Sequence, residues 1–171
     1  IGRDLDDPED VWERALDVNV NAHRWAAKYL LPEWLERGAG YFLSTASAAG
    51  LLAQIGSFAY TMTKRAAVAF AEWLSITYGD RGIVVSCLCP QGVDTDMLNA
   101  DIGLGTQVVK AAGNVLSPAA VADIVADAIA DERFLILPHP EVQRYTEIKA
   151  TDHARWLAGM RRLQATVRAS S

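Results

Sequence analysis

The chain has 171 residues, of which 51% are hydrophobic and 22% are charged, and its formal net charge is −5. This composition predicts one globular domain with a single core. The acidic balance and the dispersed Lys and Arg residues argue against a nucleic-acid partner. Because no apolar run is long enough to span a bilayer and the opening is unlike a signal peptide, we expect no membrane partner and a cytoplasmic location.

The first expected element is a helix over residues 8–37. Asp7 suits the cap, Pro8 suits the first helical position, and Gly38 stands just past the expected end. Apolar residues recur at three- and four-residue steps and predict a buried face. From the residues alone, Asn19 beside this stripe is more simply a tolerated polar neighbour than a functional group, and His23 is interpreted as a packing residue.

Two apolar segments predict parallel strands. Residues 41–46 are typical of a central strand that is buried on both faces, and residues 83–89 form the next buried strand. The helix expected between them makes a strand-helix-strand unit, which requires parallel pairing. Cys87 and Cys89 are expected on opposite faces of the second strand, as reduced core residues, so we predict neither a disulfide nor a metal site.

The helix between the strands carries the candidate chemistry. Tyr60 and Lys64 are four residues apart, so a helix would place both side chains on one face. A positive charge beside a phenol favours the phenolate, and we therefore expect a lowered pKa at Tyr60 and acid/base competence. Ser47, where the first strand gives way to small residues, could hydrogen-bond a substrate oxygen. Taken singly, Tyr60 and Lys64 are more simply an ordinary surface pair, and Ser47 is more simply a loop serine.

The rest of the chain gives weaker signals. Residues 51–56 predict a loop bordering the substrate, and residues 97–114 predict a mobile flap over it or, alternatively, a linker. Ser117 and Pro118 start a helix that runs to Ala130, followed by a short strand over residues 134–137. Residues 141–168 predict one terminal helix.

Four features occur together in one order: S-x-x-G from Ser47 to Gly50, Tyr60 thirteen residues after Ser47, Lys64 four residues later, and Pro90 after the second strand. In combination they resemble the catalytic core of the short-chain dehydrogenase/reductase family, in its compact single-domain branch. The resemblance covers nearly the whole chain, from about residue 11 to the strand near residue 134. It implies an α/β fold, a Rossmann-like doubly wound parallel sheet of which this chain holds the second half.

The resemblance also implies an activity. An enzyme of this family transfers a hydride between NAD or NADP and a carbonyl or alcohol substrate. Tyr60 would be the proton donor or acceptor, Lys64 its electrostatic partner and a ribose ligand, and Ser47 the anchor of the substrate oxygen. Asn19 lies in the D-V-N-V segment over residues 17–20, which matches the segment where the family has a catalytic Asn that holds a proton-relay water.

The family's turn beside the nicotinamide is usually P-G-x-V-x-T. Here Pro90, Val93 and Thr95 are in register, whereas Gln91 stands where Gly is usual and Gly92 comes one residue later. We therefore expect a shifted turn in which Pro90, Gly92, Val93 and Thr95 still face the cofactor.

The family's glycine-rich dinucleotide-binding half has no counterpart, because no G-x-x-x-G-x-G or G-x-G-x-x-G run occurs. We therefore expect residues 1–171 to form a single partial domain, and the choice between NAD and NADP stays open. The alternative function is a non-catalytic half-domain that acts as an interaction module. The helices over residues 11–37 and 58–78, the second through Ala67 and Ala71, are expected to pair with copies in a homodimer or homotetramer.

Overall fold

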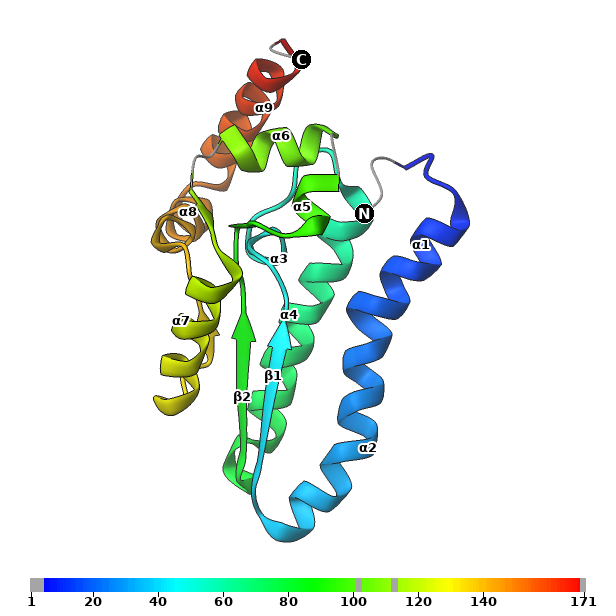
Figure 1. The fold of residues 1–171 in the computed structure, drawn as a ribbon, viewed down its shortest axis with the longest axis vertical. Helices are drawn as coiled ribbons and strands as arrows, with labels where there is room; N and C mark the ends of the chain where they lie inside the picture. The colour runs from blue at the N-terminus through cyan, green and yellow to red at the C-terminus, as the bar shows by residue number, and fades with distance from the viewer. Residues whose placement is uncertain (1–4, 101–102, 112–113, 170–171) are drawn as a thin grey trace.

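The computed structural model describes residues 5–100, 103–111 and 114–169. Its centre is a parallel three-stranded sheet in the order β1-β2-β5, formed by β1 (Gly40–Thr45), β2 (Ile83–Leu88) and β5 (Leu135–Ile136). In Figure 1, α4 (Phe58–Tyr78) lies behind β1 and β2, α2 (Ala22–Arg37) lies on the β1 side and α7 (Pro118–Ala130) on the β5 side. The α/β class with parallel strands is confirmed.

The two main strands pair in register from Gly40 opposite Ile83 to Thr45 opposite Leu88. The expectation that the first strand is central and buried on both faces was wrong. β1 is an edge strand of the described sheet, and Leu43 on its outer face is 36% exposed. Helices α2 and α4 cover only the face that carries Phe42, whereas β2 lies between β1 and β5 and is buried along most of its length.

The long first helix has three consecutive parts: α1 (Glu9–Leu16), a π-helical turn η1 (Asp17–Asn21), and α2. It begins one residue later than expected, because Pro8 occupies the N-cap position, and Gly38 ends it with a left-handed backbone (φ 68°). The π turn widens the helix around Asn19. Such turns are often found at functional sites.

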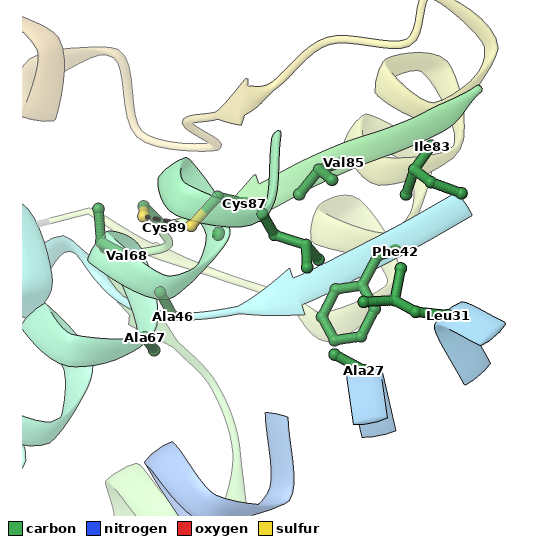
Figure 2. Packing of buried hydrophobic residues seen from close by; sticks show 12 residues of the cluster. Ala27, Leu31, Phe42, Ala46, Ala67, Val68, Ile83, Val85, Cys87 and Cys89 are labelled. Carbon is green, nitrogen blue, oxygen red and sulfur yellow. Dashed lines mark hydrogen bonds between the residues drawn. The ribbon is translucent and has the colours of Figure 1, made fainter. Parts of the chain in front are cut away.

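Figure 2 shows the main core between α2, α4 and the sheet, with Leu31 and Ala27 beside Phe42, and Ala67 beside Ala46. Ala67 and Ala71 are fully buried in this core. The Ala-rich face of α4 packs against the sheet of its own chain. Ala67 and Ala71 therefore cannot form the subunit contact that was expected from the sequence.

The two cysteines were wrongly expected on opposite faces. Side chains two residues apart in a strand share a face, and the Sγ atoms of Cys87 and Cys89 lie 3.8 Å apart (Figure 2). Both are free and buried, as reduced core residues would be.

The region after β2 has more regular secondary structure than expected. The proposed flap contains α5 (Asp96–Ala100) and α6 (Leu104–Ala111), and its residues 101–102 and 112–113 lie outside the described residues. Short strands β3 (Gly92–Val93) and β4 (Val115–Leu116) pair in parallel beside it. Ser117 caps α7 by accepting a hydrogen bond from the backbone N of Ala120, as its position before Pro118 predicts.

The terminal segment forms two helices, not the single one expected. They are α8 (Pro140–Thr151) and α9 (His153–Ala169), and the carboxylate of Asp152 between them accepts a hydrogen bond from the backbone N of Arg155 at 2.9 Å. Asp is common at such cap positions, because its side chain accepts a hydrogen bond from a backbone N–H that has no partner within the helix. Here this bond helps to start the second helix. The remaining short elements are α3 (Ala48–Leu51) and the 3-10 turn η2 (Gly79–Arg81). Across the described ranges, no helix is both long and apolar enough to cross a membrane.

Candidate active site

A cavity of about 500 Å³ lies at the carboxyl ends of β1 and β2. In α/β sheets this is the edge at which ligands usually bind. Seven of the residues singled out from the sequence line it: Asn19, Ser47, Tyr60, Lys64, Pro90, Val93 and Thr95. Gly92 does not line this cavity; it is buried behind the turn, where an added Cβ would lie 2.9 Å from the side chain of Val109.

Tyr60 and Lys64 lie one turn apart on α4, with the Lys64 Nζ 5.7 Å from the centre of the Tyr60 ring. The ammonium donates a hydrogen bond to the carbonyl oxygen of Thr45, the last residue of β1, at 3.0 Å. Burial raises the pKa of Tyr60, and a hydrogen bond with Ser47 offsets only part of this effect. The expectation that the neighbouring charge lowers the pKa of Tyr60 was therefore wrong. Burial destabilises the phenolate more than the neighbouring groups stabilise it. Burial also lowers the pKa of Lys64.

Ser47 is placed by the end of β1 and the start of α3. Its Oγ accepts a hydrogen bond from the backbone N of Ala49 at 3.1 Å and donates to the carbonyl oxygen of Pro90 at 3.5 Å. The cap explains why a Ser follows the strand here. It also orients the hydroxyl between Tyr60 and the turn that follows β2.

Asn19 reaches the cavity from the π turn. Its Nδ2 donates to the Oγ1 of Thr63 at 3.0 Å, and Thr63 in turn donates to the carbonyl oxygen of Ala59 at 2.8 Å. Thr63 is buried on α4 beside Lys64 and was missed in the sequence. The available signal was a hydroxyl residue three positions after Tyr60, in a helix that is otherwise mostly apolar.

The turn after β2 is held by His139, which the sequence interpretation also missed. The fully buried ring accepts a hydrogen bond from the backbone N of Gln91 at its Nδ1 (3.1 Å). A ring that accepts at Nδ1 carries its proton at Nε2, which donates to the carbonyl oxygen of Gly92 (3.0 Å). The ring thus holds the backbone of Gln91 and Gly92 in place, whereas the expected shift of the turn stays a prediction. The contact spans 48 residues of sequence, so no local pattern could predict it.

The loop and flap expected around the substrate do border the cavity. Gln54 donates from its Nε2 to the carbonyl oxygen of Gly105 at 3.0 Å, which ties the loop before α4 to α6. Met97 and Leu98 of α5 and Thr106 of α6 line the cavity on this side. The segment expected as a flap thus borders the cavity and is built from helices, and its position over a substrate stays a prediction.

His23 does not line the cavity. Its ring stacks on Phe70 with the centres 6.5 Å apart, which agrees with a packing role. Burial and, second, the charge of Lys64 lower its pKa.

Residues 3–104 match the family model described as short chain dehydrogenase. The chain belongs to this family. Among curated proteins it is similar to 3beta-hydroxysteroid dehydrogenase 2 of Eggerthella lenta, at 36% identity over 90 residues, which is 52% of this chain and 35% of the relative. It is also similar to 1-deoxy-11-beta-hydroxypentalenate dehydrogenase of Streptomyces exfoliatus, at 32% identity over 139 residues, which is 80% of this chain and 49% of the relative.

The matched regions thus cover less than half the length of these two curated relatives. Among solved structures, it resembles a short-chain dehydrogenase/reductase of Burkholderia phymatum in complex with NAD, with a TM-score of 0.77, 25% identity, and coverage of 88% of this chain and 62% of that one. A short-chain dehydrogenase of Sphingobium yanoikuyae in complex with NADPH has the same fold, with a TM-score of 0.72, 19% identity, and coverage of 94% and 58%. The Rossmann-like class expected from the sequence is confirmed.

Proposed function

We propose that this short-chain dehydrogenase chain carries the catalytic part of an oxidoreductase that transfers a hydride between NAD or NADP and a carbonyl or alcohol carbon. The proposal rests on one observation: Asn19, Ser47, Tyr60 and Lys64 come from three separate segments and line a single cavity. Membership of the family supports the general class of reaction. The substrate, the direction of the reaction and the choice between NAD and NADP stay open.

The cavity has groups that fit a nicotinamide cofactor. An ammonium has three donors, and the described structure uses one of those on Lys64 for Thr45, which leaves others for ribose hydroxyls. The buried Oε1 of Gln91, at the wall formed with Pro90, has no hydrogen-bond partner among the described residues and could accept from a carboxamide N–H. When bound, the cofactor would supply or accept the hydride.

The side chains then act on the oxygen of the substrate. Ser47 donates a hydrogen bond to the carbonyl oxygen, and Tyr60 transfers its proton to that oxygen as the alcohol forms. The raised pKa keeps the phenol protonated at neutral pH, which suits the reductive direction; the oxidative direction needs the phenolate and should gain rate as the pH rises. Lys64 favours the phenolate once the proton has left, and Asn19 holds a water that returns a proton.

The proposal includes the protein's assembly. Large apolar side chains remain exposed on α2 and α4, and we propose that they form the contact of a homodimer or homotetramer: Trp25, Tyr29, Trp73 and Ile76. That residues 1–171 form a single partial domain, and that the protein is cytoplasmic, stay predictions. The competing function is a non-catalytic interaction module that would use the same exposed surface.

Tyr60→Phe tests the mechanism. The ring and its packing stay, but the transferred proton is gone, so we expect turnover to fall by about a thousandfold or more while cofactor affinity changes little. Reduced nicotinamide fluorescence measures binding and absorbance measures turnover. Tyr29→Phe is the matched control, because Tyr29 is exposed on α2, does not line the cavity, and as Phe keeps the ring that the proposed subunit contact uses.

Near-normal turnover in Tyr60→Phe would exclude the proposed mechanism. If the wild-type protein neither binds NADH or NADPH nor turns over a ketone, the interaction module is the better description.

A further inference from the structure

A second cavity, of about 550 Å³, lies beneath the C-terminal helices. Figure 1 shows α6, α8 and α9 gathered around the end of the molecule at which β1 and β2 end, and residues of these helices and of α3 line the cavity. Its volume is within the range of small-molecule sites, about 300–1,000 Å³. Most of the lining is apolar and includes Leu52, Val108, Ile148, Trp156, Met160 and Leu163.

Two cations lie in this apolar lining. Arg155 and Arg162 are seven residues apart on α9, so two helical turns place both on the face that borders the cavity. Within the described residues, neither guanidinium has an ion pair and no Asp or Glu lines the cavity. Asp152 contacts the backbone N of Arg155, not its guanidinium. In a chain of net charge −5, this leaves an apolar cavity whose lining carries two positive charges without an ion pair among the described residues.

The second cavity adjoins the first. Gln54, Gln91 and Val109 line both, so the partition between the two cavities includes their side chains. The unpartnered Oε1 of Gln91 belongs to this partition. A ligand longer than the first cavity would therefore pass these three side chains to reach the second.

The short helix α3 connects the two cavities. Lys149 of α8 donates hydrogen bonds to the carbonyl oxygens of Leu51 (2.6 Å) and Leu52 (2.9 Å), where α3 ends. Ser47, which lines the first cavity, caps the start of the same short helix. The wall of the second cavity is thus held in a fixed position relative to the hydroxyl that is proposed to bind the reacting oxygen.

We propose that the second cavity binds the distal part of the substrate: an elongated apolar ketone or alcohol with a carboxylate at its far end, bound by Arg155 and Arg162. The inference rests on the proposed function, because it places the reacting carbon beside Tyr60. Burial of the chain against the apolar lining favours binding. A guanidinium binds a carboxylate with charge-assisted hydrogen bonds, so two of them select the acid over its neutral analogue.

The test compares two homologous series by calorimetry on the full chain: unbranched methyl ketones with a terminal carboxylate, and methyl ketones of the same length without it. We expect the best keto acid to bind about tenfold or more tightly than its neutral match. The double variant Arg155→Gln with Arg162→Gln should lose this preference. Arg161→Gln is the matched control, because it removes a charge from the same helix at a position that does not line the cavity.

A second variant fills the cavity. A Cβ added at Gly159, which lies between the two arginines and lines the cavity, would meet only the Arg162 guanidinium, at 3.9 Å, so the Cβ itself causes no clash. Gly159→Phe should abolish keto-acid binding, whereas Gly159→Ala should retain it. Circular dichroism checks that each variant is folded.

Equal affinity for keto acids and neutral ketones, or an unchanged preference in the double Arg variant, would overturn this inference. The binding assay needs no turnover, so the two proposals fail separately. If keto acids bind with an Arg-dependent preference while Tyr60→Phe turns over at the wild-type rate, the catalytic proposal falls and the second site stands.

Discussion

At the scale of single residues, the candidate site depends on side chains that position others. Thr63 connects Asn19 to α4, and His139 holds the turn that carries Gln91 and Gly92. Neither was among the site residues predicted from the sequence. Both are almost fully buried, and their polar atoms make the hydrogen bonds described above. A buried polar group that is satisfied in this way fixes geometry, because leaving its partner without a bond costs about 1–3 kcal/mol.

Thr63→Val should show this effect. The substitution keeps the shape of the side chain but removes the acceptor of the Asn19 amide, so we expect a loss of about 1–3 kcal/mol in the free energy of unfolding. Turnover should fall as well, because the amide loses its orientation. Urea denaturation and steady-state kinetics measure the two effects.

Thr63→Ser keeps the hydroxyl and is the control; it should retain most of the turnover. Equal turnover in the Val and Ser variants would mean that the Thr63 hydroxyl does not position Asn19.

At the scale of elements, two loops make a close contact at the end of the sheet opposite the cavity. One loop joins α2 to β1, and the other joins α4 to β2. Gly38 follows α2 and Gly82 precedes β2, both with a left-handed backbone, and the backbone N of Gly40 donates to the carbonyl oxygen of Gly82 at 3.1 Å. This contact starts the register in which Gly40 lies opposite Ile83. The register in turn brings the ends of both strands level at the candidate site.

Gly82→Ala should therefore be strongly destabilising. Its φ of +82° disfavours a side chain, and an added Cβ would collide with the carbonyl oxygen of Gly38. We expect a loss of about 2 kcal/mol or more in the free energy of unfolding, measured by urea denaturation.

Gly79→Ala is the matched control in the same connection. Gly79 has helical angles and open space around an added Cβ, so the stability should be unchanged or rise by up to about 1 kcal/mol. Similar losses in both variants would show that the contact with Gly38 does not limit the register.

At the scale of the whole molecule, α2 and α4 carry large apolar side chains that packing among the described residues of a single chain does not bury. Trp73 is 52% exposed and Ile76 is 85% exposed, although the opposite face of α4 is buried in the core. Exposed apolar side chains of this size are candidates for a protein–protein contact. Ala67 and Ala71 lie on the face of α4 that packs in the core. The interface is therefore expected on the exposed face of α4 instead.

Trp73→Glu with Ile76→Glu should reduce the assembly. Charges at these positions would be buried without partners in a contact between copies, so we expect the mass measured by light scattering to fall toward that of one copy. Glu33→Gln changes an exposed charge elsewhere on α2 and serves as the control. If an assembled wild-type protein keeps its mass in the double variant, α4 is not the interface.

The sequence by itself determined the features that depend on neighbouring residues. The spacing of Tyr60 and Lys64 placed both on one helix face, Gly38 and Ser117 marked helix ends, and the apolar runs located the strands. These signals are local because caps, turns and periodicity act over a few residues. The ordered set of motifs then indicated the family.

Only the tertiary structure decided how these parts work together. The pKa of Tyr60 rises because segments distant in sequence bury the phenol, and spacing alone pointed to the opposite direction. Asn19 meets Thr63 across 44 residues, and His139 meets Gln91 across 48. Such contacts, like the inward orientation of Ala67, are set by how whole elements pack, because desolvation and hydrogen bonding depend on every neighbour in space and not on neighbours in the chain.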